Sequence, residues 1–287
     1  MELGEAAALA DTFITSLIFK VHSLPLSERS ARAAQWWRKE GSRIPLRAAL
    51  EEKRRHLSCF SSRKKTDKPR DRCLHLTISA MTNDHGQGRC PALQDAVCGI
   101  YERRPLTCRT VPLHYSRPMS VLGRYIDTFT GSAGYECDTS ANAPAILEGR
   151  SILDPLIRQA RDDAISMAKT DKAWKDRMLL MMDDPAMAAA AGLPTYNAVL
   201  ENSHNGYATT LPMIVAWRIA RNEGLMPPEV FEDVCRKQAA LIKAHMETLS
   251  ETAGADLRDM LPAYEFELSA PPRPTRSRAS ILMPQAP

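Results

Sequence analysis

The 287-residue sequence has few aromatic side chains and no long hydrophobic run. Phenylalanine, tryptophan and tyrosine make up 6% of it, and the apolar stretch from Phe13 to Val21 is interrupted by Thr15, Ser16 and Lys20. A helix that crosses a bilayer needs about 20 consecutive, mostly apolar residues. The sequence therefore predicts no association with a membrane.

The common signatures of nucleotide binding and hydrolysis are also missing. The chain contains no G-x-G-x-x-G, no P-loop, no G-x-S-x-G and no H-E-x-x-H pattern. Its net charge is only +4, and the basic run at 63–72 has no interleaved aromatic residues. Because single-stranded nucleic acids bind through basic and stacking side chains together, the sequence disfavours a nucleic-acid partner.

Hydrophobic residues make up 44% of the chain, which is enough for a substantial core. In residues 1–58 the apolar side chains recur at helical spacing, which predicts N-terminal helices. The spacing is carried by Leu9, Phe13, Leu17 and Val21. This regularity is lost in residues 59–144, where Leu74–Ile78 and Tyr125–Phe129 are candidate short strands.

Helical periodicity returns in residues 145–268, with one helix expected to begin at Pro228. Residues 269–287 are rich in proline and are predicted to form a disordered tail. The resulting prediction is a mainly α fold, in which a helical scaffold surrounds an irregular, cysteine-rich metal-binding segment. A bound metal is expected to hold such an irregular segment together.

The seven cysteines are unevenly distributed, because six of them lie between Cys59 and Cys137. The N-terminal residues are acidic where a secretory signal is basic, which favours a cytoplasmic location. Thiols stay reduced in the cytoplasm, and an odd number of cysteines does not suit a framework of disulfides. Clustered cysteines in this setting indicate metal binding.

Three of the cysteines fall within nineteen residues, in the run Cys90-Pro-Ala-Leu-Gln-Asp-Ala-Val-Cys98-Gly-Ile-Tyr-Glu-Arg-Arg-Pro-Leu-Thr-Cys108-Arg. Thiolates are soft ligands that suit zinc, iron and iron–sulfur clusters. Neighbouring arginines, at positions 103, 104 and 109, are expected to lower the pKa of these thiols.

A tetrahedral site needs a fourth ligand, and the sequence offers several. Cys73 lies upstream of the motif and Cys137 downstream, with Cys73 slightly favoured. Three histidines remain alternatives, namely His75, His85 and His114. Cys59 in its basic stretch is the least suited, and Cys235 is predicted to be a core residue because it lies on the apolar face of a predicted helix.

The motif resembles the signature of the YkgJ-type cysteine-cluster proteins, a zinc- or iron-chelating family that includes the flagellin lysine-N-methylase group. The match is close over residues 90–112 and looser over 59–140. It rests on Cys90-Pro91, Leu93, Cys98, Ile100-Tyr101-Glu102, Arg104-Pro105, Cys108-Arg109 and Pro112. The resemblance implies that Cys90, Cys98 and Cys108 bind a metal or an iron–sulfur cluster. The family usually has a dense cysteine run before this motif, where the present chain has only Cys59 and Cys73.

Two functions follow as expectations. The first is a metal-binding protein that coordinates iron, as an iron–sulfur cluster, or zinc. Relatives in the methylase group suggest that it modifies a protein or peptide substrate, although the sequence leaves open whether it is an enzyme. The second is a non-enzymatic adaptor in which a structural zinc holds the irregular segment together.

Overall fold

A computed structural model describes residues 1–25, 70–81, 90–95, 97–115, 117–119, 122–130, 138, 140, 142–201, 207–248 and 255–270. Several sequence-based expectations lie outside these residues. They are the helices expected between 26 and 58, the tail beyond residue 270, and the side chains of Cys59, Cys73, His85 and Cys137.

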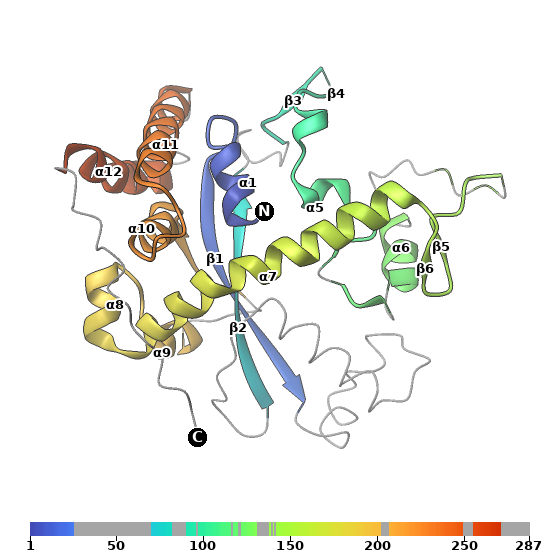
Figure 1. Cartoon of the computed structure of the whole chain (residues 1–287), viewed down its shortest axis with the longest axis horizontal. Coiled ribbons are helices and arrows are strands. Elements are labelled where there is room, and N and C mark those ends of the chain that lie inside the picture. The colour runs from blue at the N-terminus through green and yellow to red at the C-terminus, as the bar shows by residue number, and fades with distance from the viewer. Residues whose placement is uncertain are drawn as a thin grey trace.

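The fold is mainly α, as the sequence predicts, and the long helix α7 crosses in front of a small antiparallel sheet (Figure 1). The N-terminal half contains α1 (Leu3–Ala8), β1 (Thr15–Pro25), β2 (Arg70–Ala80), β3 (Leu93–Gln94), β4 (Val97–Cys98), the 3-10 helix η1 (Tyr101–Arg103), α5 (Leu106–Arg109) and α6 (Leu122–Thr130). The C-terminal half contains β5 (Leu147–Glu148), β6 (Ser151–Ile152), α7 (Pro155–Asp183), α8 (Pro185–Ala191), α9 (Tyr196–Glu201), β7 (Tyr207–Pro212), α10 (Ile214–Asn222), α11 (Pro228–Thr248) and α12 (Ala255–Ser269).

The helix predicted through Leu17 and Val21 is wrong, because the chain forms strand β1 from Thr15 onward. β1 is the central strand of the sheet β2-β1-β7, in which both pairings are antiparallel. Leu17, Phe19 and Val21 are all buried and alternate along the strand. Residues four apart share a face in a helix and also in a strand, so the spacing of Leu17 and Val21 did not distinguish the two.

The strand predicted at Leu74–Ile78 is confirmed and is part of the longer β2, whereas the strand predicted at Tyr125–Phe129 is wrong. The latter segment is helix α6. Its two aromatic rings lie four residues apart on one helical face, with centroids separated by 6.4 Å. Leu122 anchors the helix, because it is fully buried against Leu113 and Ile152.

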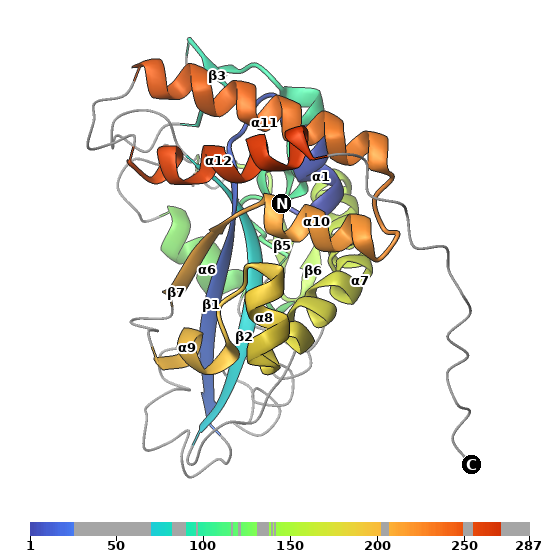
Figure 2. The ribbon, with the colours of Figure 1, turned by 90° about the vertical axis from the view of Figure 1, so that its left-hand side faces the viewer.

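One hydrophobic core joins the sheet to the C-terminal helices. It combines Phe19 and Leu76 of the paired strands with Trp217 of α10 and Tyr264 of α12, whose rings meet edge to face at 6.3 Å. Helices α11 and α12 lie side by side against this core (Figure 2). α11 begins at Pro228, as the sequence predicts.

Helix α7 begins with a well-formed cap. Asp154 accepts hydrogen bonds from the backbone N–H groups of Leu156 and Ile157, and Pro155 occupies the first turn. This cap defines where α7 starts, next to the cysteine motif that its first half supports. Among the described residues, no helix has the length and apolar character that crossing a bilayer requires.

Candidate metal centre

The cysteine motif folds as a turn, a short hairpin and a single helical turn. Cys90 begins it, and its carbonyl oxygen accepts a hydrogen bond of 3.1 Å from the N–H of Leu93. Leu93 in β3 lies opposite Cys98 in β4, and Asp95 turns the hairpin with a φ of 49°. The hairpin therefore brings Cys98 back toward Cys90. Cys108 follows in α5, which starts after Pro105.

The structure places these three cysteines in one neighbourhood with free thiols. Partial burial of its sulfur atom raises the pKa of the Cys108 thiol, and the nearby thiols of Cys90 and Cys98 raise it further. The chain's terminal ammonium and Arg104 oppose this shift without reversing it. Arg104 therefore lowers the pKa of the Cys108 thiol as expected, but burial and the neighbouring thiols outweigh it and the net shift is upward. The raised pKa keeps the Cys108 thiol protonated at neutral pH, so a metal that binds there must displace its proton.

Cys90 and Cys108 are exposed, and Cys98 is partly exposed. Within the part of the chain that the structure describes, however, no three His, Cys, Asp or Glu side chains converge closely enough to hold a metal ion. The three thiols are thus neighbours on a solvent-accessible surface. The three thiols would have to move closer together to bind one metal or cluster.

Cys73 lies in β2, where its backbone pairs with His22 of β1. The motif packs at the other end of β2, because Ala92 and Ile100 share a small apolar cluster with Ala80. Ala80 follows Cys73 by seven positions along the strand, which corresponds to about 23 Å. His75 is on the same strand, about 17 Å from Ala80. This placement weighs against Cys73 and His75 as the fourth ligand.

His114 remains chemically suited to bind a metal, because its imidazole is held neutral. Burial, together with the charges of Arg117, the chain terminus and Arg161, lowers its pKa to about 4. Its ring stacks on Tyr115 with 4.8 Å between the ring centroids. Cys235 is fully buried in α11, where burial raises its pKa to about 12. Its prediction as a core residue is confirmed.

The motif is fastened to the helical scaffold by contacts of its own. Leu106 of α5 is buried against Ala160 and Ala164 of α7. The backbone N–H of Leu106 donates a 2.7 Å hydrogen bond to Oε1 of Glu5 in α1. Apolar packing and a charge-assisted hydrogen bond thus hold α5 between α1 and α7. These contacts reduce the need for a metal whose only role is to hold α5 in place.

Arg161 is a buried residue that the sequence analysis missed. It is 4% exposed, and its guanidinium donates to the carbonyl oxygens of Leu113 at 3.1 Å and His114 at 2.7 Å, and to that of Arg117. These bonds hold the loop that follows the motif against α7. The sequence could have indicated its burial, because Arg161 is spaced so that it shares one face of α7 with the buried residues Ala164 and Ala168.

A cavity of about 580 Å³ lies beside the motif, between α1, α5 and α7. Arg104 and Arg109 contribute positive charge to its wall, whereas Glu5 and Asp163 contribute negative charge. Arg104 folds back over the Tyr101 ring, 3.6 Å from the centroid, and its Nε donates to the Tyr101 carbonyl oxygen. The cavity can therefore bind a polar molecule that has both a positively and a negatively charged group.

A buried network of charged groups holds the start of α1 to α7. Lys175 Nζ lies 2.7 Å from Glu2 Oε2, and the two side chains are 4% and 5% exposed. Tyr115 donates its hydroxyl to Glu2 Oε1 at 3.0 Å, and Leu3 N donates to Asp171 Oδ2 at 2.7 Å. Burial raises the pKa of Asp171 to about 7, reinforced by its hydrogen bond to Glu2 and by the charge of Glu2.

Asp171→Asn is expected to stabilise the protein at about pH 8 by roughly 2 kcal/mol, and to leave it unchanged at about pH 4.5. The folded-state pKa is raised, so the stability that Asp171 contributes is present at low pH and is lost as the pH rises toward about 7. Asparagine keeps an acceptor for Leu3 N and a donor toward Glu2. Urea unfolding at both pH values measures the effect.

The control is Asp162→Asn, which alters an exposed carboxylate on the same helix and should leave the pH profile of stability parallel to the wild type. If Asp171→Asn were destabilising at both pH values, the carboxyl group would be ionised in the folded protein, and the assignment of a raised pKa would be incorrect.

Comparisons with protein-family models, with curated proteins and with solved structures find no match to this chain. What the chain binds is therefore inferred from its own residues and their arrangement.

Proposed function

We propose that this chain is a metal-binding protein of the YkgJ type, which holds iron as an iron–sulfur cluster, or zinc, through Cys90, Cys98 and Cys108. The observation that carries the proposal is the grouping of these three free thiols by the β3–β4 hairpin and α5. Zinc and iron–sulfur clusters both favour thiolate ligands. The positive charge of either would offset the crowding of three thiolates.

The fourth coordination position determines what the site can do. Cys73 lies toward the far end of β2 from the motif, which leaves Cys137, a histidine or a molecule from outside the protein as the fourth ligand. Three protein ligands with an exchangeable fourth are the arrangement that catalytic metal sites use. The exposure of the thiols supports such an open position.

The neighbouring cavity supports the proposal that a protein or peptide substrate reaches the centre. Arg104 and Arg109 can pair with a carboxylate, and Glu5 and Asp163 with an ammonium group. A peptide carries groups of both kinds. Modification of such a substrate in the cytoplasm, where thiols remain reduced, is the function we propose.

The alternative is an adaptor in which zinc is purely structural. It requires a closed site of four protein ligands, and the segment would lose its fold when the metal is removed. The packing of Leu106 on α7 and its hydrogen bond to Glu5 already fasten α5 without a metal. These contacts favour the first function over the adaptor.

Anaerobic purification followed by metal and sulfide analysis tests the proposal. We expect stoichiometric iron with acid-labile sulfide and a brown chromophore for a cluster, or stoichiometric colourless zinc. Cys90→Ser, Cys98→Ser and Cys108→Ser should each abolish stoichiometric loading, whereas Cys235→Ala should retain it because that thiol lies in the core. Wild-type protein that binds no metal under reducing conditions would falsify the proposal.

The same measurement assigns the fourth position. Cys137→Ser should weaken loading if a fourth cysteine closes the site, and Cys73→Ser should not. If neither variant changes the metal content, an exogenous ligand or a histidine completes the coordination. A closed four-cysteine zinc site whose removal unfolds the segment would support the adaptor instead.

A further inference from the structure

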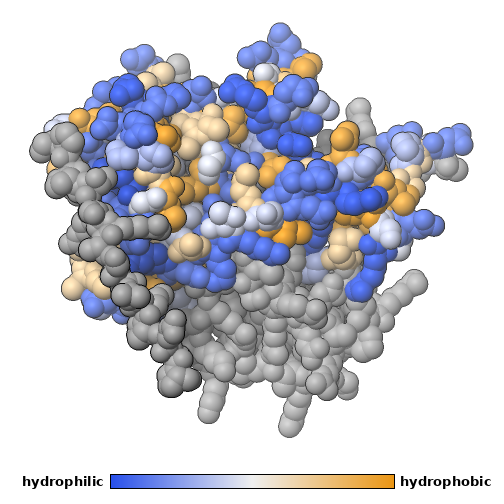
Figure 3. Space-filling view, viewed as in Figure 1, coloured by the Kyte–Doolittle hydropathy of each residue, from blue (hydrophilic) through white to orange (hydrophobic). Residues whose placement is uncertain are grey.

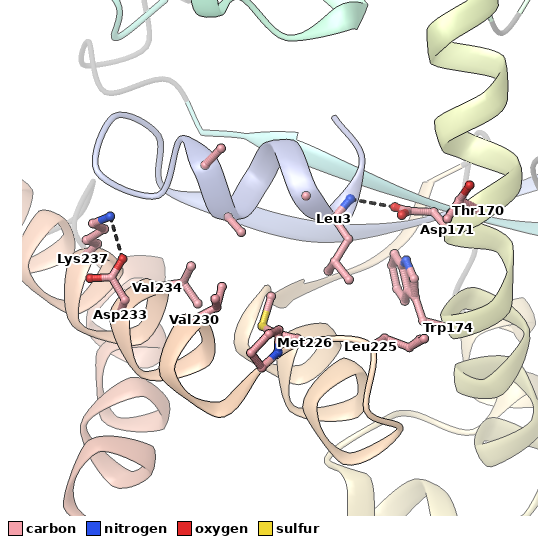
Figure 4. Close-up of a pocket in the computed structure, with 14 residues that line it drawn as sticks. Leu3, Thr170, Asp171, Trp174, Leu225, Met226, Val230, Asp233, Val234 and Lys237 are labelled. Atoms are coloured by element: carbon pink, nitrogen blue, oxygen red, sulfur yellow. Dashed lines mark hydrogen bonds and ion pairs between the residues drawn. The ribbon is translucent and has the colours of Figure 1, made fainter.

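A second cavity, of about 560 Å³, lies on the side of α1 opposite to Glu5, which accepts the hydrogen bond from Leu106 N in the cysteine motif. Its walls come from α1, α7, the turn after α10 and the start of α11 (Figure 4). The side chains that face it are mostly apolar, including Leu3, Trp174, Met226 and Val234. Figure 3 shows apolar residues gathered at this position, between α7 and the α10–α11 side of the molecule. Pockets for small molecules typically measure about 300–1,000 Å³ and have walls of this kind.

The wall of this cavity contains a buried hydrogen-bond donor that meets no acceptor among the described residues. Trp174 is 1% exposed, and its indole Nε1 has no hydrogen-bond partner within that part of the chain. In Figure 4 the indole nitrogen is at the end of the ring nearer Asp171, beside Leu3. A buried N–H that has lost its water and found no acceptor is unfavourable. Because this nitrogen has almost no exposed area, an acceptor reaches it only when neighbouring side chains move, and a ligand that makes this contact would remove that cost.

The charged residues around the cavity are already engaged. At its mouth Lys237 pairs with Asp233 at 2.6 Å. At its inner end the carboxyl group of Asp171 accepts from Leu3 N and interacts with Glu2. An anionic ligand would face these two acidic residues, and a cationic one would be desolvated among apolar side chains. The lining therefore suits a molecule without charge.

We propose that this cavity binds an uncharged small molecule that has an apolar ring and one hydrogen-bond acceptor, such as a carbonyl oxygen, placed to accept from Trp174 Nε1. The apolar body would fill the space between α1 and α11, and the carbonyl would reach the inner wall. The proposal does not depend on a metal at the cysteine motif, and its test can succeed or fail whatever the motif binds.

Two probes of nearly equal shape separate the hydrogen bond from the apolar contact: acetophenone, which has a carbonyl, and α-methylstyrene, in which a methylene group replaces the oxygen. The four tryptophans of the full chain give indole N–H signals in a ¹⁵N–¹H spectrum. Acetophenone should move the Trp174 indole proton downfield. The Trp217 signal is the internal control, because its Nε1 is also buried without an acceptor from the residues that the structure describes, and Trp217 does not line the cavity.

Trp174→Phe removes the donor and keeps an aromatic ring. The affinity of acetophenone relative to that of α-methylstyrene should fall roughly fivefold in this variant, which is the effect of one net hydrogen bond. Taking the ratio cancels the change in cavity size that both probes experience. An unchanged ratio, or equal movement of the Trp174 and Trp217 signals, overturns the proposal.

Gly4→Leu provides a test that does not alter the core. Gly4 is an exposed residue of α1 that lines the cavity, and a Cβ atom added there meets no other atom within 4 Å. The leucine side chain should occupy the cavity and weaken both probes at least fivefold, with the fold intact. Binding that is insensitive to Gly4→Leu places the probes elsewhere and contradicts the proposal. Failure of acetophenone to bind the wild type at millimolar concentration contradicts it as well.

Discussion

Gln238→Glu is expected to lower the free energy of unfolding by about 4 kcal/mol at neutral pH. The Gln238 side chain is fully buried in α11. Its Nε2 donates to the carbonyl oxygens of Ala10 at 2.6 Å and Phe13 at 2.7 Å, and its Oε1 accepts from Thr15 N at 3.1 Å. One amide thus satisfies two backbone groups of the turn between α1 and β1 and the first backbone N–H of β1.

The substitution keeps the size of the side chain and reverses its hydrogen bonding. A carboxylate would place an oxygen, and a buried negative charge, against two carbonyl oxygens. Burial would raise the pKa of the new carboxyl group in the folded protein above its value in the unfolded chain. The stability of the variant should therefore fall further as the pH rises from about 5 to about 8.

Urea unfolding at the two pH values measures this result. Gln159→Glu is the matched control, because Gln159 is exposed on α7 and its amide also donates a hydrogen bond, to Asp163 at 2.7 Å. Gln159→Glu should lower the free energy of unfolding by no more than about 0.5 kcal/mol. A loss below about 1 kcal/mol in Gln238→Glu would show that the amide does not bridge α11 and the turn in the folded protein.

Lys175→Met is expected to cost about 3 kcal/mol at about pH 8, because it leaves the buried carboxylate of Glu2 without its cation. Burial alone would raise the pKa of Glu2, but the charge of Lys175 and the hydrogen bonds from Asp171 and Lys175 keep it below its usual value. A lowered pKa contributes stability at neutral pH that is lost as the pH falls. The gap between wild type and variant should therefore narrow toward about pH 4.

Lys172→Met on the same helix is the control for this pair. Lys172 also pairs with a carboxylate, that of Asp176, but both side chains are 36% exposed. Exposed ion pairs contribute little, so its loss should change stability by less than about 1 kcal/mol at any pH. Equal effects of the two substitutions would mean that water reaches Glu2 and screens its interaction with Lys175.

The contacts of Gln238 and those of Lys175 both affect the candidate metal centre, because both hold α1 in place. Gln238 holds the turn at the end of α1, and Lys175 holds Glu2 just before its start. Between them, Glu5 of α1 accepts the hydrogen bond from Leu106 that fastens α5, the element that carries Cys108. The position of one motif cysteine thus depends on buried polar contacts made elsewhere in the chain.

The features that could be predicted are those that depend on residues close together in the sequence. The start of α11 at Pro228 and the burial of Cys235 on its apolar face follow from residues close together in the sequence. Strand β1 was mistaken for a helix because Leu17 and Val21 fit both periods, and pairing with β2 and β7 decided between them. Those partner strands begin 55 and 192 residues after Thr15, so no local pattern contains that information.

The sequence by itself determined the mainly α class, because helical periodicity depends on neighbouring residues, and it predicted Cys90, Cys98 and Cys108 as candidate ligands. Only the tertiary structure decided that Cys73 lies toward the far end of β2 and that α5 is held between α1 and α7. It also decided the pairing of Glu2 with Lys175, 173 residues apart. Such contacts depend on how separate elements pack, and the free energy of burying charged groups is set by that packing.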